Sequence, residues 1–307
     1  MSGIAKRYPS LIIAVLFSCI LTVEIFADGI VLNGTSQLSE NGTSTSPAVW
    51  WFDGNYVSPA GSLFEVGVRV GGAASYNELT VSNGVTFSAS SGLWVGRNNT
   101  FHNQLNIQNN ANVVVNGSVN CGEGGMMYYS KNHHINISGI NARLSATEDL
   151  DFSHGYNATE NYLTLSDGGI AVVDSDKNGT GSFSLYNHWS YGNCWMELDG
   201  GSLLLYGDKT ADFASGEGIL SSIKVWNAAS NSLQRVAYYD SQTLKETDSI
   251  NLLEVDYIED EADAILHGLD NEFVGFTVVR NIPEPATMGL SLFAFGILWW
   301  LKRNRFL

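Results

Sequence analysis

The chain has 307 residues, with 31 Asp and Glu against 15 Lys and Arg, so its net charge is −16 and its pI is near 4.6. Nucleic acids and anionic membrane surfaces are therefore poor partners, because both repel an acidic chain. Three cysteines in a chain of this length exclude a dense disulfide framework.

Residues 1–27 have the composition of a secretory signal peptide. Lys6 and Arg7 precede a short apolar stretch from Leu11 to Val23, and we expect cleavage after Ala27. The signal predicts export by the general secretory route.

The exported part, residues 28–281, contains ten Lys and Arg against 29 Asp and Glu, a net charge of −19. It holds two cysteines, Cys121 and Cys194. An oxidising compartment would allow them to form one disulfide, but the sequence favours two buried free thiols. Residues 28–65, which include Trp50 and Trp51, are expected to cap one end of the fold that follows.

Residues 66–220 contain an irregular repeat of short strands. Stretches such as "ELTVSNGVTFSAS", "LNIQNNANVVVNG" and "YLTLSDGGIAVVD" each predict strand, Gly/Asn/Asp turn and strand. The first strands align at intervals of 26, 30, 28 and 33 residues, with these apolar residues in register: Leu79, Leu105, Ile135, Leu163 and Met196.

A third, shorter strand containing glycine precedes most of these pairs, at Val70-Gly71, Val95-Gly96, Cys121-Gly122 and His154-Gly155. Three short strands per repeat are the contents of one turn of a parallel β-helix, in which each repeat buries its apolar face on the next. The repeats resemble those of autotransporter passenger domains. We predict an all-β, irregular right-handed parallel β-helix, or β-solenoid, with a β-sandwich or jelly roll as the alternative.

The sharpest local pattern in the repeats is Asp174-Ser175-Asp176-Lys177-Asn178-Gly179. It matches half of a calcium loop, with Asp174, Asp176 and Asn178 as ligands, but Leu185 stands where such a loop has a bidentate Glu. An Asp/Asn/Gly run between two strands is also typical of a plain turn. Calcium is thus the one cofactor that the sequence suggests.

Three other groups suggest chemistry more weakly. Glu148, Asp149 and Asp151 could act on polysaccharide, with Asp149 and Asp151 on one face of a strand and Arg143 or Lys177 as a base. His133 and His134 could recruit a metal if His102 or His154 lay close. The aromatic residues Trp94, Trp189, Tyr191 and Trp195 could stack on sugars or fill a core.

From residue 221 to residue 281 the repeat is absent. Residues 259–267 predict a short helix that Gly268 ends, and "EFVGFTVV" predicts a last strand. This segment is placed to cap the open edge of the solenoid, or to form a small α+β region.

The tail, residues 282–307, combines Pro283-Glu284-Pro285, an uncharged run from Ala286 to Leu301 and a basic end. The run would make about 24 Å of helix, enough with tilt and flanking Trp residues to predict one transmembrane span. The tail resembles the PEP-CTERM sorting signal. That resemblance implies a membrane-anchored precursor in the inner membrane, recognition of the Pro-Glu-Pro tripeptide by an exosortase, and release to the surface.

No catalytic motif of the common hydrolase, nucleotide-binding or metalloprotease types is present. The sequence therefore predicts a non-enzymatic cell-surface or matrix protein, associated with biofilm or extracellular polysaccharide. A β-helix polysaccharide lyase or glycoside hydrolase is the alternative. A permanently anchored membrane protein would share the fold and differ only in its tail.

Overall fold

The structure is a computed structural model, and it describes residues 37–38, 48–51, 55–58, 63–66, 68–69, 72–73, 75–97, 99–123, 130–154, 158–185 and 194–282. The chain divides into two compact units, residues 1–31 and 32–307, and every described residue belongs to the second. The predicted signal peptide and the tail after Ile282 lie outside the described residues.

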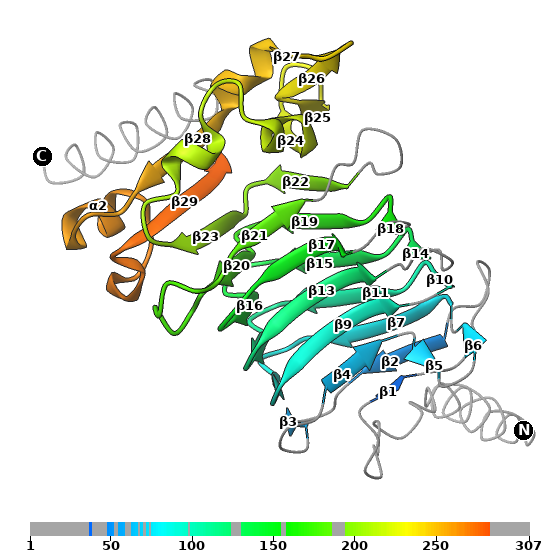
Figure 1. Ribbon diagram of the computed structural model, residues 1–307. Coiled ribbons are helices and arrows are strands. Elements are labelled where there is room, and N and C mark those ends of the chain that lie inside the picture. The colour runs from blue at the N-terminus through cyan, green and yellow to red at the C-terminus, as the bar shows by residue number, and fades with distance from the viewer. Residues whose placement is uncertain are drawn as a thin grey trace, which may run out of the picture. The chain divides into compact units, whose positions relative to one another are not determined.

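The described residues form a β-solenoid of about five turns, in which each turn adds one strand to each of three sheets (Figure 1). Sheet I contains, in spatial order, β2 (Ala48–Trp51), β7 (Asn77–Val81), β11 (Gln104–Gln108), β15 (His134–Ser138), β19 (Tyr162–Ser166), β22 (Trp195–Asp199), β24 (Ile223–Asn227) and β25 (Ser232–Arg235). Sheet II contains β3 (Tyr56–Val57), β8 (Thr86–Ala89), β12 (Asn112–Val115), β16 (Arg143–Ala146), β20 (Ile170–Val173), β23 (Ser202–Tyr206), β29 (Phe276–Asn281) and β28 (Leu253–Tyr257). Sheet III contains β1 (Gln37–Leu38), β4 (Leu63–Val66), β9 (Gly92–Arg97), β13 (Ser118–Glu123), β17 (Leu150–His154) and β21 (Phe183–Leu185).

The remaining elements are short. A three-stranded sheet joins β10 (Thr100–Phe101), β14 (Ser130–Lys131) and β18 (Ala158–Thr159). Two hairpins pair β5 (Val68–Arg69) with β6 (Gly72–Ala73) and β26 (Ala237–Asp240) with β27 (Thr243–Glu246). The helices are η1 (Thr210–Phe213), η2 (Gly218–Ser222), η3 (Asp248–Leu252), α2 (Glu261–Leu266) and η4 (Asn271–Phe273).

The predicted register of the repeats is confirmed. Leu105 pairs in parallel with both Leu79 and Ile135, and Leu163 pairs with both Ile135 and Met196. Their side chains form one column inside the solenoid and are fully buried. A β-sandwich is excluded, because its strands pair antiparallel whereas these pair in parallel.

The core consists of such columns, one for each inward-facing position of a strand. Besides the column through Leu79, these are Val81, Ile107, Ile137, Leu165 and Leu198 in sheet I, and Phe87, Val113, Leu144, Ala171 and Leu203 in sheet II. Each residue of these two columns is at most 1% exposed. Burial of one such Leu, Ile, Val or Phe side chain contributes roughly 1.5–3 kcal/mol, so each turn stabilises its neighbours.

A column of polar side chains also runs inside the solenoid, two residues before the column through Leu79. This interior ladder consists of Asn77, Asn103, His133 and Asn161, each at most 1% exposed. Asn103 Oδ1 accepts the N–H of Asn77 at 3.0 Å. In the same way His133 Nδ1 accepts the N–H of Asn103 at 3.1 Å, and Asn161 Oδ1 accepts the N–H of His133 at 2.9 Å. Three buried N–H groups are thereby satisfied: that of Asn77, at the start of β7, and those of Asn103 and His133, which lie just before β11 and β15.

Two glycines of sheet III make room for the interior ladder. A Cβ atom on Gly96 would lie 2.2 Å from Cε1 of His133, and one on Gly122 would lie 2.2 Å from Nδ2 of Asn161. Their φ angles are +78° and +81°, which also favour glycine. The repeated third strand with glycine is therefore explained by the side chain that packs on it.

The third strand is predicted correctly at Val95 and Cys121, which pair with each other. The prediction that Val70 and His154 share this position is wrong, since Val66 pairs with Val95 and Phe152 pairs with Cys121. The loops that follow this strand differ in length, so counting back from the next repeat misplaces it. As expected, Cys121 and Cys194 form no disulfide with each other and are fully buried.

Parallel stacking begins earlier than residue 66. The segment assigned to an N-terminal cap, residues 28–65, supplies β2 and β3, which pair in parallel with β7 and β8. Most of β4 also lies in this segment, and β4 pairs in parallel with β9.

The direction of pairing reverses after the last turn. β24 is still parallel to β22, but β25 is antiparallel to β24, and β29 is antiparallel to both β23 and β28. Helix α2 lies within the predicted helix, and the Asp260 carboxylate caps it by accepting the N–H groups of Ala262 and Asp263. A second apolar cluster joins this segment to sheet II: Val172, Leu204, Ile258, Ala264, Phe273, Phe276 and Val278.

Candidate functional site

The predicted calcium loop joins β20 to β21. Asp174 is 1% exposed, and its Oδ1 accepts the N–H of Asn178 at 3.1 Å. Asp176 Oδ2 accepts Nδ2 of Asn178 at 2.9 Å, while Asn178 Oδ1 accepts the N–H of Thr180 at 2.8 Å. The amide oxygen of Asn178 is thus already used within the loop, as in an Asx turn.

The two carboxyl groups of this loop interact. Burial, followed by a hydrogen bond with Asp176, raises the pKa of Asp174, and the N–H groups of Asn178, Gly181 and Gly179 oppose that rise. Asp174 Oδ2 is buried without a hydrogen-bond partner. Two adjacent carboxyl groups, one of them buried, can share a proton or hold a cation. Calcium binding here stays a prediction.

The predicted acidic group, Glu148, Asp149 and Asp151, lies at the start of β17, in the fourth turn of the solenoid, which consists of β15, β16 and β17. Its carboxylates bond to different serines. Asp149 Oδ1 accepts both the N–H and the hydroxyl of Ser182 at 2.8 Å, and Asp151 Oδ1 accepts the hydroxyl of Ser184 at 2.5 Å. Glu148 Oε2 accepts the hydroxyl of Ser118 at 3.0 Å, on the opposite side of the turn. Asp149 and Asp151 do share one face, as predicted, because their partners are two residues apart.

The two basic residues proposed to approach that group are directed elsewhere. Arg143 forms an ion pair with Glu272 at 2.6 Å and stacks over Phe273. The Lys177 ammonium donates to the carbonyl of Val274 at 3.2 Å. Neither basic residue is therefore placed beside the acidic group as the base that an elimination would use.

His133 and His134 point to opposite faces of sheet I, so they cannot bind one metal together. Because the N–H of Asn103 donates to Nδ1 of His133, the proton of that neutral ring is on Nε2, which faces the Ser130 hydroxyl at 2.9 Å. Burial, and then the nearby His102, lowers the pKa of His133 to about 3. His133 is a structural residue of the interior ladder, and the side chain of His154 lies outside the described residues.

The outer face of sheet I carries linked polar side chains. Asn106 Nδ2 donates to Glu78 Oε1 at 2.7 Å, and Asn106 Oδ1 accepts Gln104 Nε2 at 2.6 Å. Further along the sheet, His134 Nε2 lies 2.8 Å from Thr164 Oγ1, which donates to Glu197 at 3.5 Å. Burial lowers the pKa of His134, although Glu197 opposes this effect.

Trp195 lies on the same face, on β22, and its ring is covered by two cations from the strands that follow, β24 and β25. Lys224 Nζ lies 4.5 Å from the ring centroid and Arg235 Cζ lies 4.2 Å from it, so Trp195 is only 6% exposed. Lys224 also pairs with Glu197 at 2.8 Å. Trp195 is therefore not free to stack on a sugar, while Trp189 and Tyr191 lie outside the described residues. Trp94, on sheet III, lies under Arg97 at 4.6 Å.

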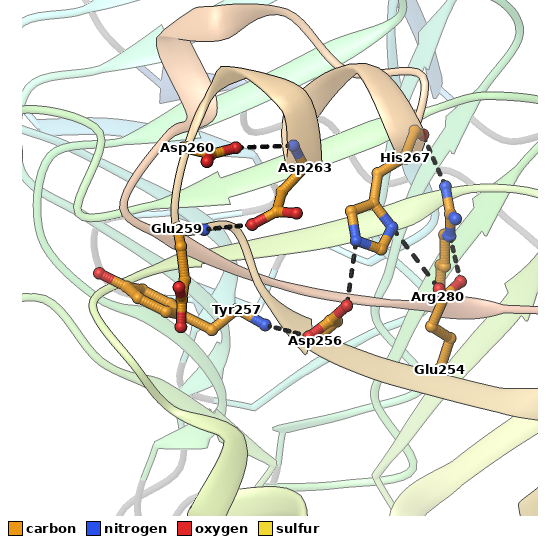
Figure 2. Close-up of polar contacts among 8 residues, drawn as sticks. All are labelled: Glu254, Asp256, Tyr257, Glu259, Asp260, Asp263, His267 and Arg280. Carbon is orange, nitrogen blue, oxygen red and sulfur yellow. Dashed lines mark hydrogen bonds and ion pairs between the residues drawn. The ribbon is translucent and has the colours of Figure 1, made fainter.

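Sequence reasoning missed a charged cluster between α2 and sheet II (Figure 2). The buried ring of His267 has Nε2 3.2 Å from Asp256 Oδ2 and Nδ1 3.5 Å from Glu254 Oε1. Arg280 pairs with Glu254 at 2.6 Å and donates to the carbonyl of His267 at 2.7 Å. Both ring nitrogens face carboxylates, so the cluster fastens the end of α2 to β28 and β29. Its members come from three separate elements, and no local motif marks them.

Comparison with known proteins gives no relative for this chain: no family model matches it, and neither a curated protein nor a solved structure shows significant similarity. Within the described ranges, no group of three or more His, Cys, Asp or Glu side chains is placed to hold a metal ion. No helix among the described residues is both long and apolar enough to cross a bilayer, and Pro283, Glu284, Pro285 and the predicted span lie beyond them.

Proposed function

We propose that the chain is an exported, non-enzymatic protein of the bacterial cell surface or extracellular matrix. One observation supports the non-enzymatic part: Arg143 pairs with Glu272 and Lys177 donates to the carbonyl of Val274, so neither serves as a base beside the acidic side chains of the fourth turn. The β-solenoid is then a rigid support that presents long polar faces. In this proposal the coil is right-handed and residues 221–281 act as its cap.

The route to the surface rests on the two ends of the sequence. Residues 1–27 would direct export, and residues 286–301 would hold the precursor in the inner membrane. An exosortase-type enzyme would then read Pro283, Glu284 and Pro285, which favour an extended backbone because each proline fixes φ and restricts the residue before it. Extracellular polysaccharide is the expected partner at the surface.

Mass spectrometry of the C-terminal peptide tests this route. The native protein from extracellular fractions should end near residues 283–285, and the variant Glu284→Ala should stay in the membrane with its tail intact. The matched control is a Glu→Ala substitution that leaves the tripeptide intact and remains in the exported part. Glu217→Ala meets this requirement, whereas Glu24 lies in the signal peptide, and Glu217→Ala should be processed normally. Recovery of Arg305-Phe306-Leu307 from membranes alone would show that the tail is a permanent anchor.

An activity assay tests the enzymatic alternative. Purified full-length protein in neutral detergent is incubated with neutral and uronate-containing polysaccharides, and reducing ends and unsaturated products are measured. Product formation that survives Asp151→Asn but requires the protein would show an active site elsewhere on the solenoid, and would end the non-enzymatic proposal.

Calcium is part of the proposal at the loop of Asp174, Asp176 and Asn178. Two carboxylates supply charge, but calcium takes about six to eight oxygens, so Asn178 must turn its amide oxygen inward and water must complete the shell. Calorimetry with CaCl2 should show one site that Asp174→Asn removes, whereas the exposed Asp212→Asn leaves it unchanged. Absence of heat with the wild-type protein would restrict the loop to a turn.

A further inference from the structure

Two cations face each other across the last strand pair of sheet I. Lys224 on β24 and Arg235 on β25 are direct partners in this antiparallel pair. Like charges directly opposite each other on one face destabilise a sheet. Residues that break such a rule without local compensation tend to mark a functional position.

The compensation is incomplete at Arg235. Among the arginines whose side chains the structure describes, Arg97, Arg143 and Arg280 each form an ion pair with a glutamate. Arg235 lies over Trp195, and no carboxylate of the described residues pairs with it. Glu197 neutralises Lys224 at 2.8 Å. The side chains of Trp195, Glu197, Lys224 and Arg235 together therefore carry one net positive charge.

The geometry of Arg235 suits one kind of ligand. Its guanidinium stacks on Trp195 at 4.2 Å and the residue is exposed, so the N–H groups on the edge of the guanidinium stay accessible. A planar guanidinium held by an aromatic ring binds a carboxylate through two parallel hydrogen bonds. A net charge of one also matches a carboxylate better than a doubly charged phosphate.

We propose that Arg235 and Lys224, held by Trp195, bind the carboxylate of an acidic sugar. This proposal rests on the proposed function for its ligand class, since polysaccharide is the expected partner at the surface. The sugar hydroxyls would face the adjoining outer face of sheet I, where Tyr162 lies beside Lys224 and Thr164 beside Glu197.

The overall charge of the protein restricts the length of the ligand. The exported part carries −19, which repels a long polyanion. At physiological salt, screening limits that repulsion to about 8 Å, whereas Arg235 would act in direct contact. Short uronate oligomers or sparsely acidic polysaccharides therefore fit this site.

Calorimetric titration of the full-length protein in neutral detergent tests the proposal. The probes are tetragalacturonate, a neutral galactose tetramer, sodium acetate and inorganic phosphate. Arg235→Gln should weaken tetragalacturonate binding by at least about tenfold, because it removes the bidentate partner. Lys245→Gln removes one exposed positive charge from the neighbouring hairpin and should change the affinity by less than about twofold. Equal melting temperatures of the two variants will show that both are folded.

Each other outcome overturns the proposal in a defined way. Equal binding of the neutral tetramer refutes carboxylate recognition, and equal molar affinity for acetate refutes the sugar. Tighter binding of phosphate refutes the assigned charge, and equal effects of the two variants refute the assigned residues. None of these outcomes changes the C-terminal peptide, so failure here is distinguishable from failure of the proposed surface route.

Discussion

Substituting Gly96 by alanine tests whether the interior ladder fixes the packing of adjacent turns. The new Cβ would lie 2.2 Å from the ring of His133, which hydrogen bonds to Asn103 and Ser130 hold in place. A left-handed φ of +78° adds about 1–2 kcal/mol of strain for alanine. Overpacking of the ring adds roughly 1–3 kcal/mol. We therefore expect a loss of about 2–5 kcal/mol in the free energy of unfolding.

Gly84→Ala is the matched control for this substitution. Gly84 has a similar φ of +77°, but no atom lies within 4 Å of the position its Cβ would take. Its cost should be limited to the backbone strain of about 1–2 kcal/mol. Urea unfolding followed by circular dichroism gives both values.

A second background separates the clash from the backbone. In a protein that carries His133→Ala, the ring is absent, so Gly96→Ala should cost no more than Gly84→Ala. If Gly96→Ala and Gly84→Ala are equally destabilising in the wild-type background, the packing of His133 on Gly96 does not limit stability and the reasoning fails.

Three further predictions concern the ladder, the core and the α2 cluster. His133→Asn keeps the ladder polar but removes a titrating group. In the folded wild-type protein the His133 ring stays neutral down to a pKa of about 3, whereas in the unfolded chain it binds a proton near pH 6.5. Wild-type stability should thus fall by up to roughly 1.4 kcal/mol per pH unit between those values as pH is lowered, and urea midpoints of the variant should lack that slope. Ile137→Ala should cost about 2–5 kcal/mol because the side chain is fully buried, while Ile140→Ala, at 74% exposure, should cost under about 0.5 kcal/mol in the same urea titration. Arg280→Ala leaves the carbonyl of His267 without its charged donor, so limited proteolysis should cut near α2 first; cleavage in the coils at an equal rate would contradict a local role.

The repeat register could be predicted from the sequence because alternation has a fixed period. Leu79 and Leu105 face inward on successive turns, and a slip of one residue would place each of them outside. The turn residues were also visible, since Asn83, Asn109 and Asp167 follow aligned strands and adopt positive φ. The third strand was harder to place because a loop of variable length follows it.

The interior ladder left a signal that the sequence reasoning did not use. Asn77, Asn103, His133 and Asn161 all stand two residues before an aligned apolar residue. A polar residue repeated at one register position, beside a buried column, indicates an internal hydrogen-bonding role. The pairing of Lys224 with Arg235 gave no such signal, because it depends on a change of strand direction that no repeat marks.

The register of the ladder makes each turn an exchangeable module. Residues 104–133 begin and end at equivalent positions, because Gln104 pairs with His134. Their removal would join Asn103 to His134 and place β15 beside β7, with the core columns still aligned. Gly96 would then receive Asn161, the side chain that Gly122 accommodates. The protein can therefore lengthen or shorten during evolution by duplicating or losing whole turns, while its two ends remain unchanged.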